Sequence, residues 1–360
     1  MQAEIRQLIE KNKRVFTAYR EYFHQHPELS WQETETIAYI KAKLNEWGLN
    51  YTEAAGTGLF GDIVFSSDGP TLAYRADIDA LPIDDGKDVP YKSQNPGVCH
   101  SCGHDFHTAT LLSTIQLITE LKPKLKGTFR FIFQPAEEVT PGGALSMIEA
   151  GCLNGVDHII AMHSEPNLPI GEIGVVRGWV TTQSVTYKIK IHGKGGHSAR
   201  PYQAIDPIFV ATSIIQNIYA ATERRNSFYD FFVFSMCKIH SGTKANVIPD
   251  DCEMEGSLRL TNPDKMQEVT AFIDQIINDQ AKLMGAKVEI EKIVGDPPVV
   301  NDKDFADQVA KILEPVFGFE KIHDDTRTMG GEDFSNYQRH VPGCYIRFGI
   351  ANDKLNYSLH

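Results

Sequence analysis

The chain has 360 residues, of which 42% are hydrophobic, 10% aromatic and 23% charged, and its formal net charge is −12. This composition is typical of globular proteins and excludes a disordered or fibrous chain. The excess of acidic side chains argues against nucleic acid or an anionic membrane surface as the partner, so we expect the partner to be a small molecule.

The chain carries no pattern that targets it to a membrane. Its longest apolar runs, such as residues 128–133, are far shorter than the roughly 20 residues that span a bilayer. Residues 1–16 mix charged with apolar side chains and do not resemble a signal peptide. Six cysteines are too few for a disulfide framework, so we expect reduced thiols and a cytoplasmic location.

The first half of the chain opens with two helices and then alternates strands with helices. Residues 4–23 and 33–47 have apolar side chains at helical spacing, and Gly48 is placed to end the second helix. The alternation that follows predicts an α/β fold, with a mostly parallel sheet covered by helices on both faces. The expected strands are 61–65, 71–74, 128–133 and 158–162, and the expected helices are 106–121 and 143–150.

The pattern changes near residue 180. The expected elements are strand 185–192, helix 207–222, strands 231–240 and 252–260, helix 263–284 and strand 287–293. This order is that of a small, ferredoxin-like α+β sandwich. The first pattern resumes with helix 304–316 and strand 343–349. We therefore predict a catalytic domain made of residues 1–180 and 295–360, with an inserted domain at 181–294.

A cysteine and a histidine two residues apart precede the predicted helix 106–121. The thiolate of Cys102 and the imidazole of His104 are both good ligands for zinc-like metals. Buried thiols beside surface histidines would give the same pattern. The spacing of Cys99 and Cys102 also fits a redox pair, but no second Cys-x-x-Cys pair supports a zinc ribbon.

Further metal-binding side chains follow predicted strands. Glu137 and Glu138 come after strand 128–133, and His163 comes directly after strand 158–162. The carboxyl ends of parallel strands form the ligand crevice of open α/β sheets. One glutamate could bind a metal while the other accepts a proton from metal-bound water. A solvated glutamate pair and a structural histidine are the simpler explanations, but three such sets on one sheet favour a metal site.

Two other segments have less specific patterns. Asp77 and Asp79 follow strand 71–74 and either orient a ligand histidine or cap a turn. Residues 193–198 resemble a phosphate-binding loop only superficially, because the P-loop spacing is missing. The motifs of zincins, serine hydrolases and dinucleotide-binding enzymes do not occur in the sequence.

Seven short motifs occur in a fixed order along the chain. They are HQHPEL at 24–29, YRADIDALP at 74–82, CGHD at 102–105, QPAEE at 134–138, GGHSARP at 195–201, NVIPD at 246–250 and GEDF at 331–334. In this order they resemble the M20 metallopeptidase-like amidohydrolases, and the resemblance covers essentially the whole chain. Within that family, the chain resembles the branch that holds the N-acyl-amino-acid, hippurate and indole-acetyl-amino-acid hydrolases. N-acetyldiaminopimelate deacetylase is a near relative of this branch.

The resemblance implies a zinc-peptidase-like catalytic domain that hydrolyses N-acyl amino acids at two divalent metal ions, with Glu137 as the general base. We expect zinc or manganese, with cobalt and nickel as alternatives. The implied metal ligands are Cys102, His104, Glu138, His163 and, in the final Leu-His pair, His360. Relatives continue beyond this pair, so we expect a truncated chain. Cys99 replaces a residue that is usually methionine in the family.

The inserted domain is implied to act as a lid and a dimerisation domain. Asn246 and Arg259 are expected to bind the α-carboxylate of the substrate, although a surface arginine on an edge strand is the simpler explanation. His197 follows two glycines and is expected to donate a hydrogen bond to the oxyanion. In related enzymes this histidine comes from the other subunit of a homodimer, so the resemblance implies a homodimer here. Asp77, in the second motif, is expected to be a catalytic residue. Gly331, in the last motif, is expected to bind the substrate.

Two other functions remain open from the sequence. A dipeptidase on the same scaffold would use the same residues. A protein that only binds a metal or a ligand would need no spare carboxylate next to a ligating one, so Glu137 argues against it.

Overall fold

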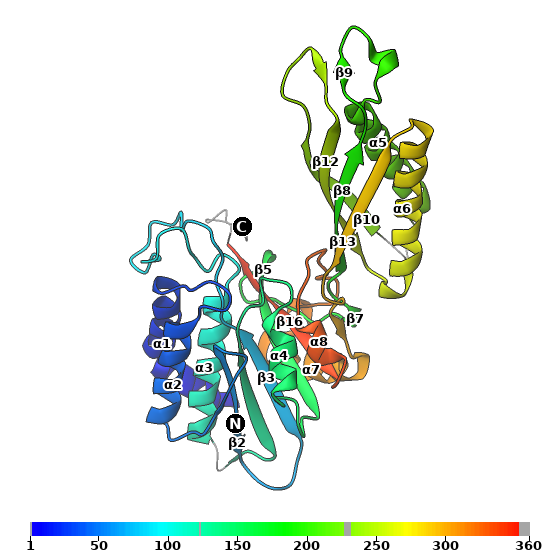
Figure 1. The fold of residues 1–360 in the computed structure, drawn as a ribbon. Coiled ribbons are helices and arrows are strands. Elements are labelled where there is room, and N and C mark those ends of the chain that lie inside the picture. The colour runs from blue at the N-terminus through cyan, green and yellow to red at the C-terminus, as the bar shows by residue number, and fades with distance from the viewer. Residues whose placement is uncertain (1, 122–123, 227–231, 353–360) are drawn as a thin grey trace. The chain divides into compact units, whose positions relative to one another are not determined.

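The computed structural model describes residues 2–121, 124–226 and 232–352. Contacts within the chain divide it into two compact units (Figure 1). The first unit comprises Met1–Val180, Val299–Arg327 and Glu332–His360, and the second comprises Thr181–Pro298 and Thr328–Gly331. By these contacts the long segment of the second unit ends at Pro298, whereas the sequence predicted that the inserted domain ends at residue 294.

The first unit is built on an eight-stranded sheet that is mostly parallel. In spatial order its strands are β1 (Thr52–Ala54), β2 (Gly58–Val64), β4 (Thr128–Gln134), β3 (Thr71–Asp77), β5 (His158–Pro169), β16 (Gly343–Ala351), β6 (Ile173–Gly174) and β15 (Ile322–His323). The central strands β4, β3, β5 and β16 are parallel neighbours, and β1 and β2 pair antiparallel at one edge. The predicted α/β class is confirmed.

Helices cover both faces of this sheet (Figure 1). Successive residues of β4 point to opposite faces of the sheet, since Phe131 joins one apolar cluster and Ile132 joins the other. The first cluster is covered by α1 (Gln2–Gln25), α2 (Thr34–Glu46), α3 (His104–Leu121) and α7 (Lys303–Phe317), and the second by α4 (Gly143–Glu149) and α8 (Ser335–Gln338). Among the described residues, no helix is long and apolar enough to cross a bilayer.

Strand β5 is longer than the sequence predicted. The apolar run ends at Met162, but pairing with β16 continues, with His163 opposite Arg347 and Ser164 opposite Phe348. Backbone pairing therefore extends the strand where hydrophobicity no longer marks it. Consequently His163 lies within the strand rather than after its end. The two-residue strands β7 (Gly178–Trp179) and β14 (Val300–Asn301) pair with each other and were also not predicted.

The second unit is an antiparallel sheet packed against two helices (Figure 1). Its strands, in spatial order, are β10 (Phe232–His240), β12 (Asp251–Leu260), β8 (Gln183–His192) and β13 (Lys287–Val294). Helices α5 (Pro207–Arg225) and α6 (Met266–Leu283) cover the apolar face, toward which β8 directs Val185 and Ile189. The shorter elements are β9 (Gly196–His197) paired with β11 (Val247–Ile248), and the 3-10 turns Pro201–Gln203, Pro263–Lys265 and, in the first unit, Phe319–Lys321.

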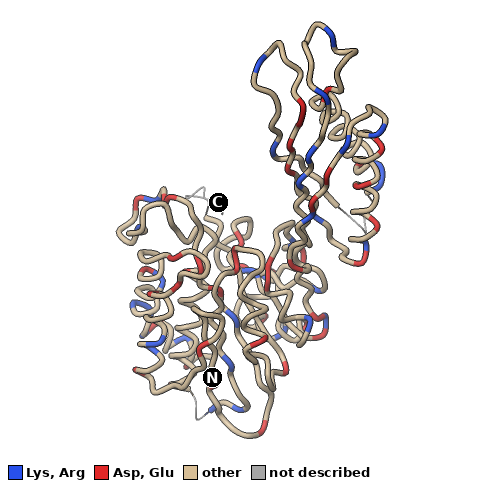
Figure 2. The backbone as a smooth tube through the Cα atoms, in the orientation of Figure 1, with Lys and Arg blue, Asp and Glu red and all other residues tan. Residues whose placement is uncertain are grey.

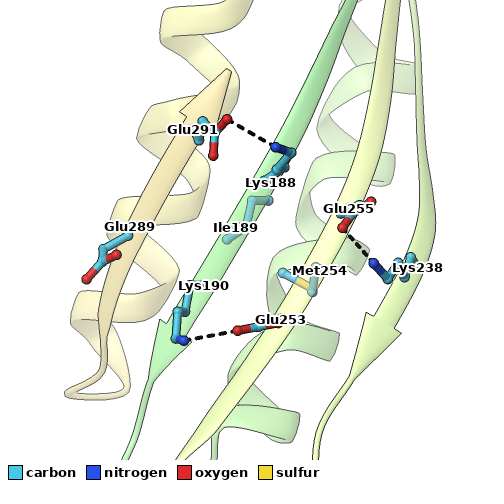
Figure 3. Close-up of a pocket in the computed structure, with 9 residues that line it drawn as sticks. All are labelled: Lys188, Ile189, Lys190, Lys238, Glu253, Met254, Glu255, Glu289 and Glu291. Atoms are coloured by element: carbon cyan, nitrogen blue, oxygen red, sulfur yellow. Dashed lines mark hydrogen bonds and ion pairs between the residues drawn. The ribbon is translucent and has the colours of Figure 1, made fainter. Parts of the chain in front are cut away.

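The other face of the small sheet carries lysines and glutamates on neighbouring strands (Figure 3). Figure 2 shows basic and acidic residues along the strands of this sheet. Three lysines of this face are paired across the strands: Lys188 with Glu291 at 3.1 Å, Lys190 with Glu253 at 3.0 Å and Lys238 with Glu255 at 2.7 Å. Exposed pairs of this kind contribute little to stability. Because these three lysines are already matched with carboxylates, the surface around them is a poor candidate for a site that binds an anionic ligand.

Candidate metal centre

Four expected metal ligands and the expected base lie close together in the first unit. The Sγ atom of Cys102 is 3.4 Å from Nε2 of His163. The Nε2 atom of His104 is 3.8 Å from Oε2 of Glu137 and 3.8 Å from Oε1 of Glu138. His104 thus belongs to three groups of potential donors: one with the thiol and His163, one with the two glutamates, and one with Asp77 and His107. This is a thiol, imidazole and carboxylate donor set that fits divalent transition metals.

Local backbone geometry brings these side chains together. Cys102 precedes α3, and Gly103 forms the turn into the helix with φ +91°. A side chain at Gly103 would place its Cβ atom 2.7 Å from the hydroxyl oxygen of Ser164. Glycine is therefore needed both for the conformation and for the close approach of β5. The two glutamates follow the end of β4, which is the edge of the sheet where open α/β folds bind ligands.

Hydrogen bonds determine which ring nitrogens face the cluster. Nδ1 of His104 donates toward the carbonyl oxygen of Asp79 at 2.9 Å and its Oδ1 at 3.2 Å. Nδ1 of His163 donates to the carbonyl oxygen of Ser164 at 2.7 Å. In both rings Nε2 is left to face the other donors. Within the described part of the chain, the buried Nε2 of His104 has no hydrogen-bond partner, as expected for an atom that binds an ion.

The charges around the cluster also fit a cation. Burial lowers the pKa of His104, but the carboxylates of Asp77 and Asp79 outweigh it and raise that pKa well above its usual value. Burial raises the pKa of Glu137 well above its usual value, and the nearby charge of Glu332 adds to this. Burial also raises the pKa of Cys102 to about 11. In the metal-free geometry, the raised pKa values keep protons on these three side chains, and a bound cation would take the place of those protons.

Asp79, rather than Asp77, contacts the expected ligand His104 through Nδ1. Asp77 lies at the end of β3, where its Oδ2 atom is 3.8 Å from Nε2 of His104. Its own partners are the imidazole of His107, at 2.6 Å, and the guanidinium of Arg75. Burial would raise the pKa of Asp77, but the charges of His104 and Arg75 and the hydrogen bond from His107 lower it well below its usual range.

Sequence reasoning missed several buried residues around the cluster. Arg75 pairs with Asp333 at 2.7 Å and with Glu332 at 3.1 Å, as well as with Asp77. Two spacings in the sequence were available as signals. Arg75 and Asp77 are two apart on a strand and so share a face, and His107 follows His104 by almost one helical turn. The pairing of Arg75 with Asp333 has no local signal, because 258 residues separate them.

The second unit brings together the other expected residues in two places. His197 in β9 lies opposite Val247 in β11, and the amide of Ser198 donates to the carbonyl oxygen of Asn246 at 3.1 Å. Arg259 donates to the carbonyl oxygen of Met329, two residues before Gly331. The expected ligand His360 lies outside the described residues.

The amino-acid sequence was compared with known families and proteins. The sequence pattern of peptidase family M20/M25/M40 matches residues 73–360. An N-acetylcysteine deacetylase of Bacillus subtilis is 40% identical over 332 residues, which cover 92% of this chain and 87% of the relative. Thermostable carboxypeptidase 1 of Saccharolobus solfataricus is 38% identical over 340 residues, which cover 93% of this chain and 86% of the relative.

A solved structure of the same family has a similar fold. The crystal structure of a dinuclear metal-binding peptidase of the M20 family from Bacillus subtilis superposes with a TM-score of 0.81 at 35% identity, covering 100% of this chain and 92% of that one. The fold, the donor cluster and the sequence matches agree with the resemblance read from the seven motifs. The chain belongs to peptidase family M20/M25/M40.

Proposed function

We propose that the protein is a metal-dependent amidohydrolase that cleaves N-acyl amino acids into a carboxylic acid and a free amino acid. The observation that carries this proposal is the position of Glu137, whose side chain is only 10% exposed and whose Oε2 atom lies 3.8 Å from His104 in the donor cluster. Glu138 is the adjacent donor, so Glu137 remains available to accept a proton from the attacking water at its carboxylate. It then gives that proton to the leaving amine.

The donor set would hold two divalent metal ions. Cys102, His104, Glu138 and His163 supply the ligands, and His360 would complete them. When bound, the ions polarise the amide carbonyl and lower the pKa of water. Thiolate, imidazole and carboxylate together favour borderline metals, and we propose zinc or manganese, with cobalt and nickel as alternatives.

His197 is proposed to stabilise the oxyanion of the tetrahedral intermediate. Its Nδ1 atom accepts a hydrogen bond from the amide of Ala199 at 3.1 Å. In a neutral ring the proton is therefore on Nε2, which can donate to an oxyanion. The side chain is exposed, as a residue that completes a site in another subunit would be. We propose a homodimer formed through the second unit, in which this histidine acts on the partner's substrate.

Arg259 and Asn246 are proposed to bind the free α-carboxylate of the substrate, and Gly331 is proposed as a further substrate-binding residue. One N–H of Arg259 bonds to Met329, and the guanidinium has five such donors, so others can bind a carboxylate in bidentate form. An N-acyl amino acid and its C-terminal amide should therefore differ strongly in kcat/KM. Equal values for the two substrates would contradict this assignment.

The substrate class is tested by comparing N-acetyl and N-benzoyl amino acids with free dipeptides, on metal-stripped protein to which each metal is added back. We expect the N-acyl amino acids to have the higher kcat/KM. Faster turnover of dipeptides would favour the peptidase alternative, which the carboxypeptidase relatives keep open. No turnover of either class by metal-loaded dimeric protein would favour a function in binding alone. The cytoplasmic location expected from the cysteine content stays a prediction.

A further inference from the structure

The residue before the proposed base has an unusual backbone conformation. Ala136 has φ +53°, in the left-handed region that an alanine rarely adopts. The direction of the Glu137 side chain depends on this backbone, because the two residues share a peptide bond. Contacts from elsewhere in the fold must therefore hold the conformation.

Three hydrogen bonds fix the backbone around Glu137. The amide of Ala136 donates to Oε1 of Glu33 at 2.8 Å, and its carbonyl oxygen accepts from the amide of Gly143 at 2.9 Å. On the other side, the amide of Glu138 donates to Oδ2 of Asp79 at 3.0 Å. Two carboxylates from distant segments thus hold the amides that flank the proposed base.

Glu33 is a buried carboxylate with no role in the reaction described so far. It lies just before α2, it is 0% exposed, and its second oxygen accepts a hydrogen bond from the hydroxyl of Thr57. A buried carboxylate is costly unless its oxygens are bonded, and both oxygens of Glu33 are bonded. It also lies outside residues 73–360, which match the family pattern.

We infer that Glu33 is a positioning residue for Glu137: by accepting the amide hydrogen of Ala136, it holds that residue in the left-handed conformation and so fixes the direction of the Glu137 carboxylate. Glu33 does not touch the reacting atoms and acts through the backbone. The inference rests on the proposed function, because it assigns Glu33 a task in the same active site.

Kinetics of Glu33→Ala test the inference. We expect kcat to fall about 10- to 100-fold, since small displacements of a catalytic group have effects of this size. KM and the metal content per chain should stay near their wild-type values. Glu33→Gln keeps an oxygen that can accept from Ala136 and should recover most of kcat. An unchanged kcat in Glu33→Ala would overturn the inference.

Glu28→Ala is the matched control. Glu28 lies in the same segment and caps α2 by accepting from the amides of Glu35 at 3.0 Å and Thr36 at 2.8 Å. It should lose thermal stability without the loss of kcat. An equal loss of kcat in Glu28→Ala and Glu33→Ala would show a general effect of the segment and would overturn the specific role.

A second substitution tests the conformational step itself. Glycine adopts positive φ without the steric cost that alanine has. Ala136→Gly should therefore raise kcat in the Glu33→Ala background and give no comparable gain in the wild-type background. Equal effects in the two backgrounds would contradict coupling between Glu33 and Ala136.

Crystal structures of the two Glu33 variants separate this inference from the proposed function. In Glu33→Ala we expect φ of Ala136 to change sign and the Glu137 carboxylate to move, and in Glu33→Gln we expect neither change. If wild-type protein hydrolyses no N-acyl amino acid, the proposed function fails, yet these structures still test the inference. An unchanged Ala136 in Glu33→Ala would overturn it whatever the activity.

Discussion

Nδ1 of His107 donates a hydrogen bond to Oδ1 of Asp77 over 2.6 Å, and both side chains are buried. On the other side of the ring, Nε2 accepts the amide hydrogen of Ser164 at 3.1 Å. His107 therefore connects the end of β3 to the backbone next to the proposed ligand His163. A single imidazole on α3 thus links the end of β3 to the middle of β5, beside the proposed metal centre.

Replacing this imidazole should weaken metal binding. We expect His107→Ala to lower the affinity for zinc by about 10- to 100-fold, as the loss of residues that orient metal ligands commonly does. The measurement is a titration of metal-stripped protein against a competing chelator. His158→Ala is the control, because this ring lies at the start of β5 and packs against Phe305 with ring centroids 4.4 Å apart. Equal zinc affinities of His107→Ala and wild type would contradict the assignment.

Metal binding should release protons and strengthen as the pH rises. Burial raises the pKa of Cys102 to about 11, so the thiol of the metal-free protein is protonated at pH 7 and must lose its proton to become a ligand. The apparent affinity should therefore rise by about tenfold or more per pH unit between about pH 7 and 9.

Calorimetry in buffers with different ionisation enthalpies measures the number of protons released. Cys102→Ser should release fewer protons than wild type. Cys99→Ser should release as many, because Cys99 is not a proposed ligand. A zinc affinity that does not change with pH would exclude Cys102 as a ligand.

His197→Ala should lower kcat by about 100- to 1,000-fold and leave KM little changed, because a positioned donor acts on the oxyanion and not on the bound substrate. If the histidine acts across a dimer, mixing this variant with Glu137→Gln protein should restore part of the activity in hybrid dimers. Subunit exchange is verified by mass spectrometry of differently labelled chains. Exchange without any recovery would rule out action in trans, and a normal kcat in His197→Ala would rule out the oxyanion role.

Much of the fold could be predicted from the sequence because its signals are local. The apolar runs of β3 and β4 and the helical spacing of α3 each identify an element without reference to the rest of the chain. Glu137, Glu138 and His163 could likewise be proposed as donors because they follow such runs, and Cys102 and His104 because they precede the run of α3. The end of β5 could not be predicted, since pairing with β16 rather than hydrophobicity extends it to Pro169.

The residues that hold the site in place were harder to find. Glu33 and Ala136 are 103 residues apart, and neither the acidic side chain nor the alanine indicates the hydrogen bond that joins them. The positive φ of Ala136 has no signal either, because glycine and asparagine, not alanine, indicate that conformation in a sequence. Buried partners of this kind become visible only when the tertiary structure is known.

The most direct test of the proposed function is the turnover of Glu137→Gln with its metal sites filled. Glutamine keeps the size of the side chain but cannot accept the proton of the attacking water, so kcat should fall by several orders of magnitude; proton transfer alone supplies about 100- to 10,000-fold. Metal analysis of the same sample must show wild-type occupancy, so that the loss reports on the base and not on the ions. We predict less than about 1% of wild-type kcat at full occupancy, and a variant that keeps more than roughly a tenth of wild-type turnover would contradict Glu137 as the general base.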